Sequence, residues 1–323
     1  MRASLSGIAL LGATLACGGA WAQAGYPSKP VTMVVATGPG ASNDLEARMY
    51  GEKLSVALGQ PFVVDYKPGA GTSLSAAYVA KSAPDGHTLL CISSSFAAAS
   101  ALYRPLPYDP LKDLAPVSIA SKRYTVIVAS PGAPFKDLRE YIAYTRANPG
   151  KVNVATSGAG SGPHINAAWL HSIVNTQVTY IHYKSAAAMQ ADLLSGRLDV
   201  TYGSLFTAVG NIKSGKIRLL AMANSERSPL FPDVPTAAEQ GVPGYNYASI
   251  TGYLAPGGTP PAIVNRLSME IAKAVKMPDV AKRLEAEGGI PVGSTPAELG
   301  QLLAAEIPRY RKLVDELNIK PEE

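Results

Sequence analysis

The feature that most constrains the fold is a regular alternation of short β-rich runs with helical stretches. Runs at 31–35, 61–66 and 87–92 are rich in apolar and β-branched residues, and the stretches between them, at 43–58 and 73–81, have helical character. Parallel strands need crossover connections, and helices usually supply them. This βαβαβ order therefore predicts an α/β fold class with a parallel sheet covered by helices.

The same alternation restarts in the middle of the chain, which predicts a second α/β unit. A strand is expected at 125–129 and a helix at 137–147. Further strands and helices are expected to alternate at 152–155, 164–173, 178–182, 186–195, 198–202, 205–214 and 217–222. The tail adds a strand at 250–254 and two helices, and Pro308 should kink or split the second of them.

The length allows one large domain or two ordinary ones, and the composition excludes several classes of protein. Hydrophobic residues make up 47% of the 323 residues and charged residues only 16%, the opposite of the balance in disordered chains. The formal net charge is +5, and Lys and Arg are scattered, so no nucleic acid partner is expected. Cys91 lies in an apolar run and is expected to be a buried, unreactive thiol.

Residues 1–24 have the pattern of a secretory signal peptide. Arg2 supplies the positive charge, an apolar stretch follows, and cleavage is expected after Ala22 or Ala24. A lipid on Cys17 is disfavoured because no Leu stands three residues before it. No later stretch reaches about 18 uninterrupted apolar residues, so we expect a secreted protein without a membrane-spanning helix.

Three loops rich in Gly and Ser follow expected strands and precede expected helices. They span 36–44, 93–96 and 156–164. In an open α/β sheet such loops gather beyond the carboxyl ends of the strands, where ligands bind. The helix after each loop presents free N–H groups and a partial positive charge, which suit a carboxylate or another small anion. The alternative is that these residues form ordinary turns and helix caps.

Motifs for catalysis, metals and cofactors match poorly. The chain has no Gly-x-Ser-x-Gly motif, no Walker A motif and no dinucleotide-binding glycine pattern. Its four histidines lack the spacing of metal ligands, so neither a metal nor a cofactor is expected. A hydrolase that uses Ser157 or Ser161 with His164 stays open as an alternative, because a catalytic triad can be assembled from distant loops.

A series of motifs, in order along the chain, resembles a known family. The motifs include Tyr26-Pro27-Ser28-Lys29-Pro30-Val31, Lys67-Pro68-Gly69-Ala70-Gly71, Ala83-Pro84-Asp85-Gly86-His87, Pro232-Asp233-Val234-Pro235-Thr236 and Leu254-Ala255-Pro256-Gly257-Gly258-Thr259-Pro260. In these motifs the chain resembles the Bug receptors, which are the extracytoplasmic solute-binding proteins of the tripartite tricarboxylate transporter family. The resemblance covers nearly the whole chain after the leader.

The resemblance implies a periplasmic-binding-protein (Venus flytrap) fold, in which two α/β lobes are joined by a hinge of crossing strands. It implies a lobe 1 made of 25–125 plus 249–323 and a lobe 2 made of 126–248, with crossings near 124–126 and 248–250. Such a protein is a periplasmic monomer that captures a small carboxylate, carries out no catalysis and delivers its ligand to a membrane permease. A sensor that reports the ligand to a signalling partner is a further alternative.

Carried onto this chain, the resemblance implies ligand contacts from both lobes. The first-lobe contacts are expected from Thr37, Gly38, Gly40, Ala41, Ser42, Asn43, Asp44, Ser93, Ser94 and Ser95. The second-lobe contacts are expected from Ser157, Gly158, Ser161, His164, Tyr183, Tyr202, Gly203 and Ser204. The first loop departs from the family pattern, and Gly203 stands where the family often has an acidic residue. The identity of the carboxylate is therefore left open.

Overall fold

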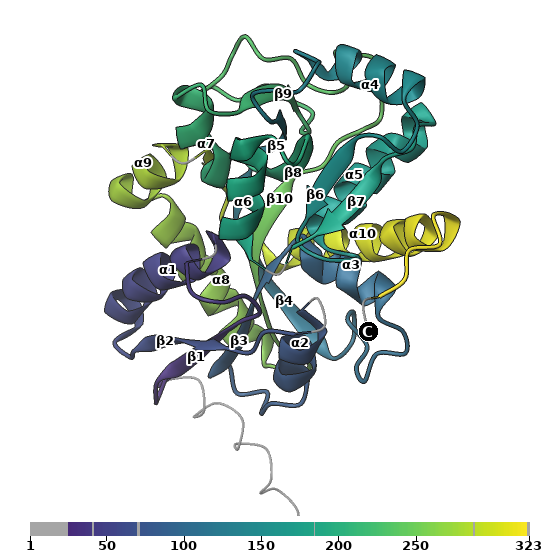
Figure 1. Ribbon diagram of the computed structural model, residues 1–323. Helices are drawn as coiled ribbons and strands as arrows, with labels where there is room; N and C mark the ends of the chain where they lie inside the picture. The colour runs from purple at the N-terminus through teal and green to yellow at the C-terminus, as the bar shows by residue number, and fades with distance from the viewer. Residues whose placement is uncertain (1–24, 41, 70–71, 184, 287, 322–323) are drawn as a thin grey trace, which may run out of the picture.

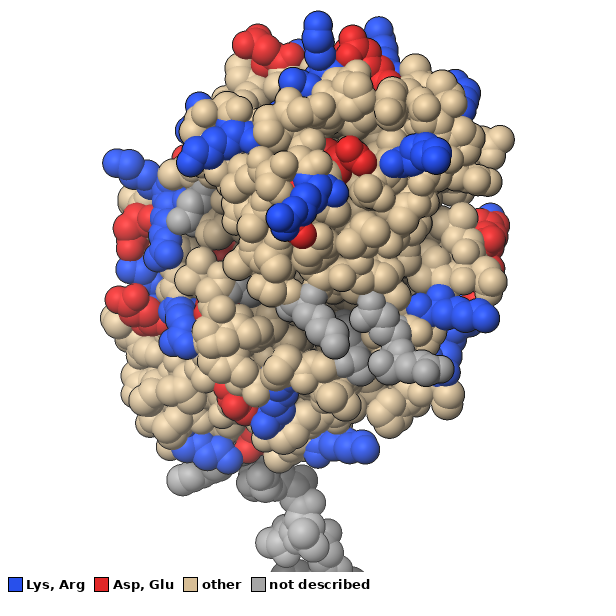
Figure 2. All heavy atoms as spheres, viewed as in Figure 1, with Lys and Arg blue, Asp and Glu red and all other residues tan. Residues whose placement is uncertain are grey.

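The protein forms two β-sheets with helices packed around them (Figure 1). The computed structural model describes residues 25–40, 42–69, 72–183, 185–286 and 288–321. The expected leader at 1–24 and the candidate site residue Ala41 lie outside the described residues. Within the described part, no helix is both long and apolar enough to cross a membrane. On the face in Figure 2, Lys and Arg are scattered among acidic residues.

The first sheet has six strands in the order β11-β4-β10-β3-β1-β2. β1, β2 and β3 are parallel, as the sequence pattern predicts, whereas β10 is antiparallel to β3 and β4, and β11 is antiparallel to β4. The strands are β1 (Val31–Val35), β2 (Phe62–Tyr66), β3 (Thr88–Ser93), β4 (Leu114–Arg123), β10 (Ser249–Pro256) and β11 (Gly289–Pro291). The helices of these parts of the chain are α1 (Ser42–Leu58), α2 (Ser73–Ala80), α3 (Ser95–Leu102), α8 (Pro261–Val275), α9 (Pro278–Ala286) and α10 (Pro296–Glu316).

The second sheet has five strands in the order β7-β6-β8-β5-β9. β6 is parallel to β7 and β8, and β5 is antiparallel to β8 and β9. The strands are β5 (Thr125–Ala129), β6 (Asn153–Thr156), β7 (Thr179–His182), β8 (Val200–Ser204) and β9 (Arg218–Met222). The helices between them are α4 (Leu138–Ala147), α5 (Gly162–Val174), α6 (Ala186–Ser195) and α7 (Leu205–Lys213).

The chain passes between the sheets at two places. Only Tyr124 separates β4 in the first sheet from β5 in the second. Asn224 bridges this crossing, because its Oδ1 accepts from Thr125 N at 2.7 Å and its Nδ2 donates to Arg123 O at 3.4 Å. The chain returns through the irregular segment 245–248, called the return segment below, and enters β10. The division of the chain into lobes at these crossings stays a prediction.

The sequence pattern does not reveal β4, α9 or β11. β4 lacks an apolar alternation because it contains Ser118, Ser121 and Arg123. The two serine side chains are buried, and their hydroxyls donate to Ser294 O at 2.7 Å and to Glu46 Oε2 at 2.5 Å. Polar residues occupy this central strand because distant parts of the chain supply their hydrogen-bond partners.

α10 continues through Pro308, so the expectation that this residue splits the helix is wrong. A proline inside a helix leaves the carbonyl four residues earlier without its N–H partner. Here that carbonyl belongs to Ala304. Both Ala304 and Pro308 lie on the exposed side of α10, where water can bond to the carbonyl instead.

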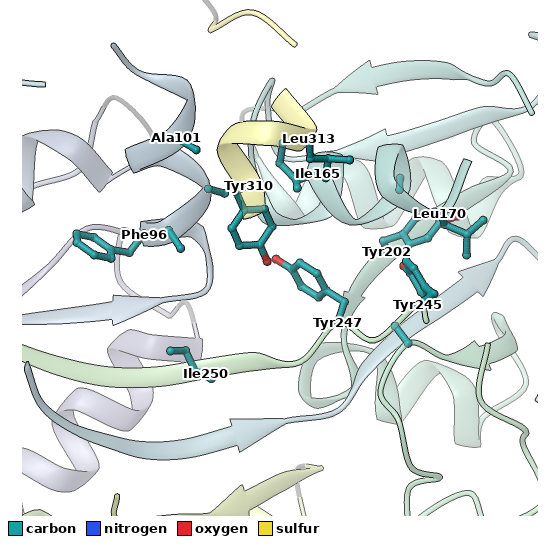
Figure 3. Packing of buried hydrophobic residues seen from close by; sticks show 14 of the residues in the cluster. Phe96, Ala101, Ile165, Leu170, Tyr202, Tyr245, Tyr247, Ile250, Tyr310 and Leu313 are labelled. Atoms are coloured by element: carbon teal, nitrogen blue, oxygen red, sulfur yellow. The ribbon is translucent and has the colours of Figure 1, made fainter. Parts of the chain in front are cut away.

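A continuous hydrophobic core joins the two sheets. One cluster of buried residues extends from Leu90 in the first sheet to Val200 in the second and includes residues of α3, α5 and α10 (Figure 3). α3 and α10 lie side by side (Figure 1). Tyr247 of the return segment and Tyr310 of α10 point their hydroxyls toward one another in this core (Figure 3). The two sheets are therefore joined by packed helices as well as by the crossing strands.

A buried ion pair lies where β4 ends. Arg123 Nε donates to Glu46 Oε1 at 2.6 Å, and both side chains are 3% exposed. The guanidinium also donates to Thr251 Oγ1 on β10 at 2.5 Å, and its carbon lies 5.8 Å from the ring centre of Phe206 on α7. At the crossing, the pair therefore connects α1 with β4 and β10 of the first sheet and with α7, the helix that follows β8 of the second sheet.

We expect the Arg123→Met variant to lose about 3–5 kcal/mol of unfolding free energy, because it leaves the Glu46 carboxylate buried without its partner. The double variant Glu46→Leu/Arg123→Met should recover most of that loss, since apolar residues can replace a buried pair. Urea denaturation measures both changes. Arg197→Met, which removes an ion pair whose arginine is 77% exposed, is the control and should change the stability by less than about 1 kcal/mol. A loss in Arg123→Met no larger than the control's would contradict this account.

Candidate functional site

A cavity of about 90 Å³ lies between the two sheets, beyond the carboxyl ends of β3 and β8. One wall comes from the residues that lead from β3 into α3, and the opposite wall from β5, α5 and the end of β8. The return segment and the start of β10 close the cavity between these walls. The described lining residues are Ser93, Ser94, Ser95, Thr125, Gly162, Pro163, Asn166, Tyr202, Gly203, Ser204, Tyr247 and Ser249.

Three serines form the wall on the side of the first sheet. Ser93 Oγ accepts from Ser95 N at 3.3 Å, at the start of α3. Ser94 Oγ donates to Ala248 O at 3.0 Å and accepts from Ile250 N at 3.1 Å. The Ser94 hydroxyl therefore holds the return segment and the start of β10 against α3.

Three helices, α3, α5 and α7, begin at this cavity. The N-cap residues of α3 and α7, Ser94 and Ser204, make no side-chain capping bond, whereas the Ser161 side chain caps α5. Helix N-termini carry a partial positive charge and N–H groups that lack helical partners. None of the described lining residues is charged. An electrostatic attraction for an anion at this cavity would therefore come from helix ends and not from a cationic side chain among the described lining residues.

The wall on the side of the second sheet contains polar atoms without partners. Thr125 Oγ1, Asn166 Nδ2 and Ser204 Oγ are buried and have no hydrogen-bond partner among the described residues. Thr125 and Asn166 are 3% and 1% exposed. Buried polar groups are nearly always hydrogen-bonded, so these three atoms are exceptions on this wall.

Tyr202 lines the cavity while its hydroxyl is engaged in the core behind it. Tyr202 Oη lies 3.4 Å from His171 Nε2, and Tyr141 Oη lies 2.8 Å from the same nitrogen. Burial lowers the pKa of His171 to about 4, so the ring is neutral at physiological pH. These hydrogen bonds anchor the end of β8, and Gly203 and Ser204 follow at the cavity.

Two glycines allow α3 and α5 to approach each other beside the cavity. A Cβ on Gly162 would lie 2.9 Å from Tyr247 Oη and 3.4 Å from Ser95 Oγ. A Cβ on Gly160 would lie 1.8 Å from Leu102 Cδ2 of α3, and the φ of Gly160 is +70°. Side chains at these positions would push the two walls apart.

Six of the predicted ligand-binding residues meet at this cavity: Ser93, Ser94, Ser95, Tyr202, Gly203 and Ser204. Of the other six lining residues, Gly162 and Pro163 lie within the expected loop at 156–164, and sequence reasoning missed Thr125, Asn166, Tyr247 and Ser249. Asn166 had a usable signal, since it lies one turn into a helix that follows a Gly/Ser loop. Thr125 and Ser249 become recognisable only when the two crossings are known.

None of the described residues of the first predicted loop lines this cavity. The loop follows β1, whose last residue Val35 pairs with Cys91 of β3, so it starts at the same sheet edge as Ser93. Within it, Thr37 Oγ1 donates to Asn43 Oδ1 at 2.7 Å. Of the other predicted residues, Gly38 is exposed and Ser42 half-buried.

Cys91 is buried as expected, and burial raises the pKa of its thiol to about 12.

Asp44 occupies the N-terminus of α1. Its Oδ2 accepts from Gly40 N at 2.7 Å, and its Oδ1 accepts from Tyr66 Oη at 2.7 Å and from Arg48 Nε at 3.0 Å. Burial by itself would raise the pKa of Asp44, but the bonds from Tyr66, Gly40 and Arg48 outweigh it and hold the pKa below its usual range. α1 thus begins beside a carboxylate of the protein itself, in contrast to α3 and α7.

The remaining predicted residues lie near the second sheet but outside this cavity. Ser157 is exposed, and Gly158 N donates to Thr156 Oγ1 at 3.4 Å. Tyr183 Oη donates to Asp192 Oδ2 at 2.7 Å. These contacts hold the loops after β6 and β7 in place.

The structure gives Ser161 and His164 capping roles. Ser161 Oγ accepts from His164 N at 3.4 Å, and His164 Nδ1 accepts from Gly160 N at 2.9 Å. His164 lines a separate cavity of about 510 Å³, together with His171 and His182. Among the described residues, no group of three or more His, Cys, Asp or Glu side chains could hold a metal ion.

The sequence matches a family of transport receptors. The model described as "Tripartite tricarboxylate transporter family receptor" matches residues 46–319. Protein BugT of Bordetella pertussis is 35% identical over 297 residues, which cover 91% of each chain. A protein of Pseudomonas sp. (strain P51), from the tcbD-tcbE intergenic region, is 34% identical over 295 residues that cover 91% of this chain and 88% of its own length.

Solved structures agree with this match. A protein of R. palustris solved with adipate is 32% identical, with a TM-score of 0.84 over 92% of this chain and 100% of its own. MatC of Rhodopseudomonas palustris, with bound malate, is 34% identical, with a TM-score of 0.81 over 90% of this chain and 100% of its own. These likenesses confirm the α/β, two-lobed periplasmic-binding-protein fold. The chain belongs to the receptor family of the tripartite tricarboxylate transporters, the solute-binding proteins of the Bug and TctC type.

Proposed function

We propose that this protein captures a small carboxylate in the cavity between its sheets and delivers it to a membrane permease of the tripartite tricarboxylate type, without catalysis. The observation that carries the proposal is that α3, α5 and α7 begin at a cavity whose described lining holds no charged side chain. Helix N-termini bind carboxylates through their N–H groups and dipoles. The relatives solved with adipate and malate support this class of ligand.

Capture is coupled to closure of two lobes, one formed by 25–125 plus 249–323 and the other by 126–248. The cavity takes its walls from both parts of the chain, so a bound ligand contacts both and favours the closed arrangement. The loop that follows β1 starts beside β3, because Val35 pairs with Cys91, and its described residues would form the outer part of the first-lobe contacts. The closed monomer in the periplasm is the form that the permease would recognise.

A carboxylate screen tests the proposed ligand class. We expect the melting temperature to rise with at least one acid in a series of mono- and dicarboxylates of two to six carbons. At 100 times its dissociation constant, a ligand adds about 2.7 kcal/mol to the unfolding free energy. The primary amides of the same acids are the control and should give no shift, because they lack the charge that helix N-termini attract. Equal responses to acids and amides, or no response to any acid, would overturn carboxylate capture.

A second prediction concerns closure. The Gly162→Ala variant places a Cβ 2.9 Å from Tyr247 Oη, so the two walls can no longer approach as closely. The affinity for the acid identified in the screen should fall about tenfold or more, because overpacking costs about 1–3 kcal/mol. Calorimetry measures the affinity, and small-angle scattering should show less contraction with ligand than in the wild type. Gly210→Ala on α7, where a Cβ meets open space, is the control. Wild-type affinity in Gly162→Ala would contradict this role.

The N-terminus of the secreted protein tests the proposed location in the periplasm. We expect the protein recovered from the periplasm of its native host to start after Ala22 or Ala24, because the leader follows the signal-peptide pattern. Mass spectrometry of the intact protein reads the cleavage site directly. A retained Met1, or a lipid on Cys17, would show that the leader has a different role.

A further inference from the structure

A second cavity, of about 200 Å³, lies on the opposite side of the return segment from the cavity of about 90 Å³ described above. The two are called the rear cavity and the first cavity below. α3, α10 and the return segment line the rear cavity, together with Lys122 of β4 and Ile250 of β10. Ser93 and Ser94 line both cavities. The rear cavity therefore has room for a small organic molecule at the point where the chain re-enters the first sheet.

Successive residues of the return segment and of β10 face the two cavities in turn. Tyr247 and Ser249 line the first cavity, whereas Asn246, Ala248 and Ile250 line the rear cavity. In extended backbone, neighbouring side chains point to opposite sides. A molecule in the rear cavity would therefore touch the same stretch of chain as the carboxylate ligand, but from the opposite side.

The charges at the rear cavity favour an anion. Its charged lining residues are Lys122, Glu306 and Arg309. Arg309 Nη2 donates to Glu306 Oε2 at 2.5 Å, so these two charges offset each other. Lys122 is exposed and forms no ion pair with the described residues. The lining therefore carries one positive charge that the protein does not neutralise within the cavity.

Glu298 acts on Lys122 from outside this lining. The pKa of Glu298 is held below its usual range by the hydrogen bonds from Thr295 and, to a smaller extent, by the charge of Lys122. Glu298 Oε2 accepts from Thr295 N at 2.7 Å and from Thr295 Oγ1 at 2.8 Å, in the capping box of α10. This carboxylate is therefore held at the N-terminus of α10, and the Lys122 ammonium stays available to an anion in the rear cavity.

Apolar side chains lie beside this charge. Ala97 of α3 and Leu302 and Leu303 of α10 line the rear cavity with Ile250. Ile250 is paired directly with Lys122 in the antiparallel ladder between β10 and β4, and directly opposed residues project from the same face of a sheet. An anion bound at Lys122 would therefore have hydrocarbon surface next to it, which favours a ligand with an apolar body.

We infer that the rear cavity is a binding site for a small monoanion with an apolar body, whose charge lies at Lys122 and whose body packs against the apolar side chains of β10 and α10. A dianion would bring its second charge to a cavity where Glu306 already occupies Arg309. The inference is independent of the proposed function, because neither Lys122 nor these apolar side chains are among the described residues that line the first cavity.

The test uses hexanoate as the probe and follows the methyl groups of isoleucine and leucine by NMR. The signals of Ile250, Leu302 and Leu303 should shift until the site is saturated, since these residues line the rear cavity. Hexanamide has nearly the same shape without the charge, and acetate has the charge without the apolar body. Each should bind at least about tenfold more weakly than hexanoate, because each lacks one of the two kinds of contact.

Two variants with opposite expected effects separate recognition of the anion from damage to the fold. Lys122→Met keeps the length of the side chain but removes its charge, so the affinity for hexanoate should fall about tenfold. Glu306→Gln removes the negative charge of the lining and should raise the affinity about twofold or more. Lys136→Met is the matched control, because Lys136 is also exposed but precedes α4 beside the second sheet, and it should keep the wild-type affinity.

A loss of affinity in Lys122→Met together with a gain in Glu306→Gln supports the inference, since a general loss of folding would weaken binding in both. The inference is overturned if Lys122→Met binds hexanoate as well as Lys136→Met does, or if hexanamide binds as tightly as hexanoate. It is also overturned if hexanoate binds without shifting the signals of Ile250, Leu302 and Leu303, which would place the probe in the first cavity. Carboxylate capture in the first cavity stands in each of these cases.

Discussion

The rest of the structure depends on the burial of Arg123 at the end of β4. A buried guanidinium requires a carboxylate and further acceptors, and here Glu46 of α1 and Thr251 of β10 supply them. A buried ion pair contributes little net stability compared with apolar residues, but its geometry is demanding. Its effect is therefore to hold α1 and both crossing strands in one arrangement at the point where the chain leaves the first sheet. The loop before α1 and the wall at Ser93 are positioned as a result.

In the proposed function the cavity holds an anion without a cationic side chain among its described lining residues, and this affects how binding would be coupled to closure. Helix N-termini and neutral donors are weak attractors in open water, where water screens them and competes for the same bonds. Their attraction for an anion becomes stronger when the two walls of the cavity come together and exclude water. A lysine or arginine in the cavity would attract the ligand in the open form almost as strongly as in the closed form.

Local patterns in the sequence were sufficient to predict the α/β alternation and the loop after β3, whereas the contacts after β8 were expected from the family resemblance. The strand at Thr125–Ala129 and the helix at Ala186–Ser195 have the expected bounds. β4 could not be predicted, since its polar residues depend on Ser294 and Glu46, which are distant in the sequence. The sequence places Asn166 one turn into a helix after a Gly/Ser loop, but the orientation of its amide depends on Tyr245, a contact that no spacing in the sequence reveals.

Thr125 and Thr201 differ in whether their buried hydroxyls have a hydrogen-bond partner. Both threonines are buried in the second sheet, yet Thr201 Oγ1 bonds to Ala155 O, whereas Thr125 Oγ1 has no partner among the described residues. If stability alone determined these positions, valine would suit Thr125 better, because it has the same shape without the unpaired hydroxyl. The same reasoning applies to the amide nitrogen of Asn166. A wall that keeps such groups gives up stability in the empty protein, and in the proposed function an oxygen of the bound carboxylate would offset that loss.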